Sequence, residues 1–377
     1  MKNCAFNLVS TLIIRRSINN KNFYKNTKNY NPDNYQQIYY FILFISIILS
    51  NSLFFVSACS PKNNQSAQEE IVEQNVTSEI AKLNKQIEAN PDNHVLYYER
   101  ALSYIENKKP YEALSDINKA LQLDPQNTEY QIVLADIYFS MGHLDNCRKT
   151  LITAADNDPS NVEPVLKLAE LDLILKDYEK MELYINKTLQ IDKVNAQAYF
   201  MLATAKKEQG DTVKALQLLT KATSLDPDYY DAYVEAGLLN LHLNIPIAED
   251  FLKTAINLRP SGIEARYALA MFYQNNEKLE QSIAEYNIIL EIDPQNYKAF
   301  FNLGYIHLIE YERYDEAIKF FTQAINTNPS YAEAYYNRGF SYELKGDKDA
   351  AQKNYRKALQ IKENYSLAID GLNRIEK

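Results

Sequence analysis

The sequence of 377 residues has no tryptophan, only eight glycines and only four histidines. So few glycines leave little room for a glycine-rich phosphate-binding loop. The histidines, at positions 94, 143, 242 and 307, have neither a cysteine nor a second histidine at a metal-ligand spacing. No serine lies in a nucleophile-elbow sequence, and the zinc-protease helix motif is missing. We therefore expect a protein that is not an enzyme and that uses no metal and no cofactor.

Three cysteines are too few for a disulfide framework. Cys4 and Cys59 lie in, or at the end of, an N-terminal leader that covers residues 1–59, so only Cys147 remains in the body of the chain. Because Cys147 stands where related segments carry small residues, we expect a buried packing residue. The mature monomer should then have no structural disulfide.

Positive charge is concentrated in the leader. Residues 1–59 carry six lysines and arginines and one aspartate, so the rest of a chain whose total charge is −9 carries −14. Nucleic acid binding requires clustered Lys and Arg to neutralise phosphates, and the acidic body has no such cluster. We expect no nucleic acid partner.

An apolar run follows the basic residues, is densest at Ile38–Leu49, and ends in Val56-Ser57-Ala58-Cys59. A basic region, an apolar region and small residues before a cleavage point are typical of a secretory signal. The last four residues resemble the lipobox of bacterial lipoproteins. This resemblance implies that cleavage leaves a lipidated Cys59 as the first residue, which anchors an exported protein in the bacterial cell envelope, at the outer membrane, its periplasmic face or the surface. The alternative is an uncleaved anchor over residues 38–58, since about 20 apolar residues span a bilayer. The polar segment 60–76 predicts a flexible tether.

From residue 94 onward the chain repeats a unit of about 34 residues, of which His94–Asn127 is the first copy. Apolar residues recur in this copy at helical spacing in two stretches, which Lys108-Lys109-Pro110 separates. Such a helix pair cannot bury its apolar face alone, so it needs neighbours of the same kind. The copies are 94–127, 128–161, 162–195, 196–229, 230–262, 263–296, 297–331 and 332–365. Segments 77–93 and 366–377 each predict one further helix that caps an end of the array.

A small residue recurs at the same place in the first helix of every copy. The residues are Ala101, Ala135, Ala169, Ala203, Gly237, Ala270, Gly304 and Gly339. We expect two helices to cross at this position, where a larger side chain would not fit. Together with small residues in the second helix and a proline after most second helices, the pattern resembles the tetratricopeptide repeat. The resemblance implies an all-α, right-handed superhelical solenoid whose first helices line a concave groove for proteins or peptides.

The resemblance also implies which residues face that groove, namely the fifth and ninth of each copy among others. The later copies offer an aromatic and aliphatic stripe, and the earlier ones offer acids. The candidates are Tyr267, Met271, Phe301, Tyr305, Tyr336 and Phe340, with Phe200, Asp136 and Glu170. A contiguous exposed apolar patch usually marks an interaction site. The alternative is that an aromatic at the fifth position only packs against the next first helix.

The sequence thus predicts a lipid-anchored envelope scaffold that binds a protein or peptide in its groove and takes part in assembling an envelope complex. One alternative is an envelope protein that binds a glycan or a cell-wall peptide, for which aromatic stacking would serve. Another is self-association through the stripe.

Overall fold

The computed structural model describes residues 78–376. The leader, Cys59 and the tether lie outside the described residues, as do the first residue of the predicted N-terminal cap and the last residue of the chain. Within the described part, residues 78–89 are helical and Leu83 and Ile87 are buried on that helix.

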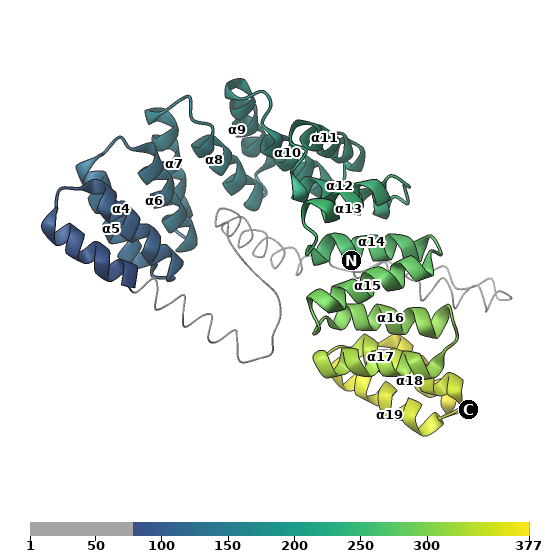
Figure 1. Ribbon diagram of the computed structural model, residues 1–377. Coiled ribbons are helices and arrows are strands. Elements are labelled where there is room, and N and C mark those ends of the chain that lie inside the picture. Colours follow the sequence, from purple (N-terminus) through teal and green to yellow (C-terminus); the bar gives the residue numbers. More distant parts are fainter. Residues whose placement is uncertain (1–77, 377) are drawn as a thin grey trace. The chain divides into compact units, whose positions relative to one another are not determined.

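Helices follow one another from there to the C-terminus of the described part, with no strand among them (Figure 1). They are α4 (His94–Glu106), α5 (Pro110–Leu123), α6 (Thr128–Ser140), α7 (Leu144–Asn157), α8 (Glu163–Ile174), α9 (Tyr178–Ile191), α10 (Ala196–Glu208), α11 (Thr212–Leu225), α12 (Tyr230–His242), α13 (Ala248–Leu258), α14 (Ile263–Asn275), α15 (Leu279–Ile292), α16 (Tyr297–Ile309), α17 (Tyr314–Thr327), α18 (Ala332–Lys345), α19 (Lys348–Ile361) and α20 (Ser366–Ile375). Each predicted copy holds one pair, so even-numbered helices from α4 to α18 are first helices and odd-numbered ones are second helices.

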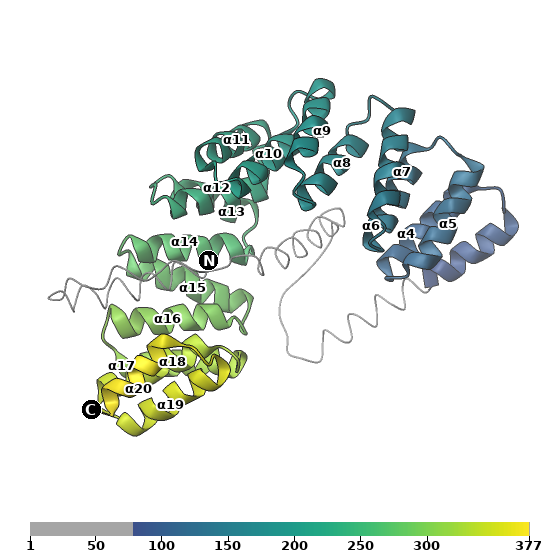
Figure 2. The same ribbon diagram turned by 180° about the vertical axis from the view of Figure 1, so that it is seen from behind.

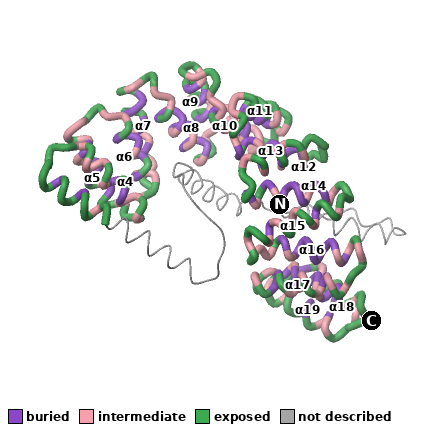
Figure 3. The backbone as a smooth tube through the Cα atoms, in the orientation of Figure 1, coloured by how far each residue is buried: buried purple, intermediate pink, exposed green. Residues whose placement is uncertain are grey.

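Each helix contacts the next one along the chain, and first helices of some neighbouring copies also touch, as α12 and α14 do. Both views of the ribbon show these successive pairs side by side (Figure 2). Buried residues recur along the helices, where one helix faces another (Figure 3). The predicted all-α repeat solenoid is confirmed.

The turn inside each pair requires one residue with a positive φ. Three pairs place glycine there, at Gly142, Gly210 and Gly346, where φ is 75°, 84° and 91°. The other five pairs place a residue with a side chain in the same left-handed region: Lys108, Lys176, Asn244, Glu277 and Glu312. Only glycine adopts this conformation without a steric cost, so the turn geometry is set by the packing of the two helices rather than by the turn residue.

The small-residue column packs against one large residue of the second helix. That residue is Ile117, Leu151, Ile185, Leu219, Leu252, Tyr286, Phe321 and Tyr355 in the eight copies, and each is at most 2% exposed. A Cβ atom on Gly304 would lie 2.8 Å from the Phe321 ring, and one on Gly237 would lie 2.6 Å from the Leu252 side chain. The expected lack of space is therefore present at both glycines.

Cys147 is a free cysteine and is buried, as expected. It packs with Ala135, Leu151 and Leu168 in the apolar contact between α6, α7 and α8. Burial raises the pKa of its thiol to about 11, so the thiol is uncharged at neutral pH and behaves as a small apolar side chain.

Candidate functional site

The nine candidate groove residues differ in exposure. Phe200, Tyr267, Met271 and Phe340 are half-buried, Asp136 is exposed and Glu170 is half-buried. Phe301, Tyr305 and Tyr336 are 5%, 4% and 1% exposed. The expectation of a continuous exposed stripe is therefore wrong at these three residues, whereas partner binding by the rest stays a prediction.

Phe301 and Tyr336 are buried because a tyrosine covers each of them. Tyr331, the residue before α18, packs edge-on against Phe301 with 5.0 Å between ring centroids. Tyr365, before α20, packs against Tyr336 in the same way at 5.5 Å. Beneath them lie the second-helix rings of Phe321, at 5.6 Å from Phe301, and Tyr355, at 5.7 Å from Tyr336. This is the alternative in which a fifth-position aromatic packs within the array.

The same position holds a helix cap elsewhere in the chain. Asn127, Asn195 and Asn296 each precede a first helix, and each side chain accepts a hydrogen bond from a backbone N–H of that helix's first turn. Tyr331 and Tyr365 make no such bond. Tyr267, which is followed by Asn296, is half-buried, but Phe200, which is followed by a tyrosine, is half-buried as well. Tyr331 and Tyr365 were the covering residues that sequence reasoning missed.

Tyr267 is held in place from two sides. Its ring meets that of Tyr286 edge-on at 5.8 Å, and the Nδ2 atom of Asn302 donates a hydrogen bond of 2.8 Å to its hydroxyl oxygen. Fixing a large amphipathic side chain in this way reduces the entropy that it would lose on binding.

Tyr305 has a different environment. Its hydroxyl is buried and has no hydrogen-bond partner among the described residues, and burial raises the pKa of this hydroxyl. An orphaned buried hydroxyl costs about 1–3 kcal/mol. Tyr305 is thus a buried packing residue rather than an exposed contact.

The two predicted acids are not equivalent. The Nζ atom of Lys167, on α8, lies 2.9 Å and 3.1 Å from the two carboxylate oxygens of Asp136, on α6. Glu170, one turn further along α8, has no hydrogen bond or ion pair among residues 78–376; burial raises its pKa, and the nearby charge of Lys167 offsets part of this effect. Sequence reasoning named both acids but missed Lys167, which pairs directly with only one of them.

Two further acids on first helices differ from Glu170 in exposure. Asp231 on α12 and Glu264 on α14 have no ion pair among the described residues, but both are exposed and lie in the first turn of their helix. By contrast Glu235, also on α12, binds Lys207 of α10 at 2.5 Å.

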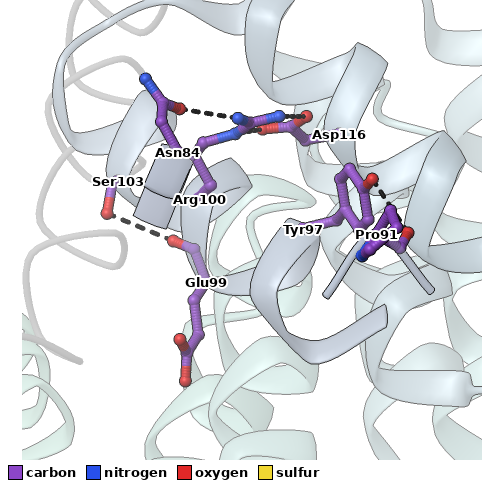
Figure 4. A network of polar contacts seen from close by, with 7 residues as sticks. All are labelled: Asn84, Pro91, Tyr97, Glu99, Arg100, Ser103 and Asp116. Carbon is purple, nitrogen blue, oxygen red and sulfur yellow. Dashed lines mark hydrogen bonds and ion pairs between the residues drawn. The ribbon is translucent and has the colours of Figure 1, made fainter. Parts of the chain in front are cut away.

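Other charged side chains serve the packing of helices. Arg100 of α4 donates two bonds of 2.6 Å to Asp116 of α5 and one of 2.7 Å to Asn84 of the helix before α4 (Figure 4). Arg148 of α7 likewise donates bonds of 2.5 Å and 3.1 Å to Asp172 of α8, whose side chain is fully buried. In both networks the guanidinium and the carboxylate satisfy each other's hydrogen bonds. We therefore conclude that these side chains stabilise the packing of the helices.

Residues 78–376 hold neither a metal-binding cluster nor a membrane-spanning helix. No group of three or more His, Cys, Asp or Glu side chains in that range is arranged to hold a metal ion. No helix of that range is both long and apolar enough to cross a membrane.

Comparison with protein families gives several matches along the chain. Models described as tetratricopeptide repeat match residues 104–171, 196–229, 263–296 and 332–365, and a model described as TPR repeat matches residues 308–346.

Curated proteins with similar sequences come from several organisms. DnaJ homolog subfamily C member 3 of Homo sapiens is 22% identical over 351 residues, which cover 76% of this chain and 69% of that protein. Protein FlbA of Caulobacter vibrioides is 26% identical over 203 residues, which cover 53% of this chain and 34% of that protein. Protein O-mannosyl-transferase TMTC3 of Homo sapiens is 24% identical over 201 residues, which cover 52% of this chain and 22% of that protein. The chain thus spans less than half the length of the last two.

Solved structures of similar fold include the APC/C hetero-tetramer Cut9-Hcn1, with a TM-score of 0.49 and 18% identity over 81% of this chain and 60% of that chain. Another is YrrB, described as a TPR protein with an unusual peptide-binding site, with a TM-score of 0.37 and 20% identity over 59% of this chain and 97% of that chain.

Proposed function

Since the chain belongs to the tetratricopeptide repeat family, we propose that it is a non-catalytic scaffold that binds protein segments along its first helices. We further propose that a lipid on Cys59 anchors it in a bacterial cell envelope, where it helps to assemble a protein complex. Repeats of this family generally bind proteins or peptides and are generally not catalytic.

One observation supports the binding role most directly. Half-buried apolar side chains share the first helices with Glu170, a half-buried carboxylate that has no ion pair among the described residues, whereas the neighbouring Asp136 is paired with Lys167. A half-buried carboxylate without a counterion costs free energy unless a ligand compensates it.

Crosslinking in native cells tests this role. A tagged full-length chain is compared with a Tyr267→Glu, Met271→Glu variant, because these two side chains are half-buried and tolerate a charge better than the fully covered Phe301 or Tyr336. The matched control is Tyr111→Glu, Val213→Glu, which adds the same charges at second-helix side chains that are 74% and 68% exposed. We expect specific proteins to be captured by the wild type and the control and lost from the first variant. Capture of no specific protein by the wild type would contradict the role, as would equal capture by all three.

The anchor rests on the sequence of the leader. Its test is the mass of the mature N-terminus in membranes, together with a Cys59→Ser variant. We expect the mature chain to begin at a diacylated Cys59, and the variant to keep its leader and lose the lipid. A chain that retains residues 1–58 and carries no lipid would favour the uncleaved anchor.

Two further measurements test the other two functions that the sequence allows. Sedimentation that shows a monomer at all concentrations would eliminate self-association. Retention of cell-wall fragments by the purified chain, with no protein captured in cells, would favour the glycan or cell-wall peptide ligand.

A further inference from the structure

The joint between the third and fourth repeats differs from the other joints of the array. It connects α9, the second helix of copy 162–195, to α10, the first helix of copy 196–229 (Figure 1). Among helices α4 to α20, the contact of α9 with α10 is the smallest between any second helix and the helix that follows it. The neighbouring joints, α7 with α8 and α11 with α12, bring more of their backbones together.

The turn that joins α9 to α10 lacks a proline. After every other repeat from the first to the seventh, the second residue of this turn is a proline, as Pro159 and Pro227 are on either side. Lys193 stands there instead, and Val194 after it is 66% exposed. Because proline fixes one backbone angle, its absence leaves this turn with more freedom than the others.

The interior of the joint holds an unsatisfied polar group. Thr188 on α9 is fully buried, and its hydroxyl has no hydrogen-bond partner among the described residues. The equivalent residue of the fourth repeat is Ala222, which packs in the apolar cluster that joins α10, α11 and α12. An unsatisfied hydroxyl at this place weakens the joint, because burial removes its bonds to water and nothing replaces them.

Two methionines fill much of the remaining interior. Met181 of α9 and Met201 of α10 belong to one apolar cluster with residues of α8, and they are the two buried methionines of residues 78–376. A methionine side chain is unbranched and fills spaces of different shape, so it keeps contact when neighbouring helices shift. The joint can therefore move without exposing a large apolar area.

Polar contacts close the joint at its other end, away from the turn. The hydroxyl of Tyr178, at the start of α9, donates a hydrogen bond of 2.5 Å to Glu208, the last residue of α10. Beside it, Lys206 binds Glu182 at 2.6 Å. The Glu182 side chain is 39% exposed, whereas that of Asp172, which forms the ion pair of the preceding joint, is fully buried. An exposed ion pair opens and closes at a small cost in free energy.

From these observations we infer that the joint between repeats three and four is a hinge. Residues 78–191 and 196–376 rotate relative to each other about the turn 192–195, and the contacts of Tyr178 with Glu208 and of Lys206 with Glu182 hold the closed position. Rotation changes the spacing between the first helices of the earlier and the later repeats, so a partner that contacts both selects one spacing from those that the free chain adopts.

Double electron–electron resonance on the full-length chain in detergent tests the hinge. Spin labels are attached to a genetically encoded keto amino acid, so that the native cysteines do not react. One pair of labels, at positions 149 and 217, spans the joint, and the matched control pair, at positions 217 and 284, spans two other joints. Lys149, Gln217 and Ala284 are exposed residues at the same place in the second helices of repeats two, four and six.

We expect a broader distance distribution for the first label pair than for the control pair, because a rotation of about 15°, as in known rigid-body switches, spreads this distance over several ångströms. Lys193→Pro with Thr188→Ala should narrow the first distribution, since it gives the joint the residues of its neighbours. Tyr178→Phe should widen it, since it removes one of the contacts that hold the closed position. Neither variant should change the control distribution, and circular dichroism establishes that each is as helical as the wild type.

Equal widths for the two label pairs in the wild type would overturn the inference. A first distribution that Lys193→Pro with Thr188→Ala leaves unchanged would overturn it as well. If this double variant does not fold, Tyr178→Phe decides, because a hinge requires the first distribution to widen in that variant while the control distribution stays the same.

Discussion

The first four repeats and the last two build the same helix pair with different side chains. In repeats one to four, an alanine of the first helix packs against an aliphatic residue of the second, as Ala135 does against Leu151. In repeats seven and eight a glycine packs against an aromatic residue, namely Gly304 against Phe321 and Gly339 against Tyr355. Repeats five and six combine the two kinds, with Gly237 against Leu252 and Ala270 against Tyr286, so the size of one residue does not by itself fix the size of the other.

The two regions also differ in how neighbouring repeats are joined. Asn127 and Asn195 cap the helices that follow the first and third repeats, and a buried ion pair of Arg148 with Asp172 links the second repeat to the third. After repeats seven and eight, Tyr331 and Tyr365 replace the cap by ring contacts. The later repeats therefore cover an aromatic residue of their first helix with a ring from the next repeat, whereas these earlier repeats are joined through polar groups.

The largest expected effect comes from the buried ion pair. Asp172→Ala removes the partner of Arg148 and should lower the free energy of unfolding by about 2–4 kcal/mol, because a charge is left without compensation in the repeat contact. Urea unfolding followed by circular dichroism measures the effect. The control is Lys167→Ala, which breaks a more exposed pair and should cost no more than about 1 kcal/mol. Equal losses in the two variants would show that the buried ion pair stabilises the earlier repeats no more than the exposed pair does.

A double-mutant cycle replaces the Gly304 and Phe321 contact of repeat seven by the alanine and leucine contact of an earlier repeat. Gly304→Ala places a methyl group against Phe321 and should cost about 1–3 kcal/mol. Phe321→Leu removes volume from the same contact and should cost a similar amount. The double variant reproduces the pair of Ala135 and Leu151. Its loss in free energy of unfolding should therefore be smaller than the sum of the two single losses by about 1 kcal/mol. Additive free energies of unfolding would mean that the two positions do not compensate each other.

Replacing a covering tyrosine by a cap tests the second difference. Tyr331→Asn removes two ring contacts, each contributing about 0.5–1.5 kcal/mol, and restores a cap that contributes about 1 kcal/mol. We expect a net loss of about 1 kcal/mol and increased solvent access to Phe301. Fluorine NMR of a chain labelled with fluorophenylalanine, with a solvent-accessible paramagnetic agent, measures that access. An unchanged Phe301 signal would rule out covering by Tyr331 as the reason for its burial.

The smallest expected effect has the opposite sign. Glu170→Gln removes a carboxylate whose pKa is raised chiefly by burial, so the variant should be as stable as the wild type at pH 7 or more stable by up to about 1 kcal/mol. Because the folded-state pKa lies above the unfolded one, the penalty is fully present above the folded-state value. It disappears as the pH falls below the unfolded value, and there the two chains should converge. Thermal unfolding over this pH range measures the difference, and a variant less stable at pH 7 would show that the fold itself needs the charge.

Much of the fold could be predicted from the sequence because each helix pair carries its own pattern. Apolar spacing, breaks such as Lys108-Lys109-Pro110 and the column that begins with Ala101 depend only on residues within one copy or its neighbour. The candidate site was harder. Exposure of Phe301 or Tyr336 depends on a tyrosine one repeat further along, and the ion pair of Asp136 depends on Lys167, 31 residues away.

The sequence by itself determined that this protein is an array of helix pairs, because a periodic apolar pattern leaves each pair unable to bury its face alone. It also determined the acidic balance of the body and the lipobox-like end of the leader. Only the tertiary structure decided which aromatic side chains are covered and which carboxylates lack a counterion. The physical reason is that burial and charge compensation depend on side chains from different repeats that meet in space, and no local pattern encodes those distances.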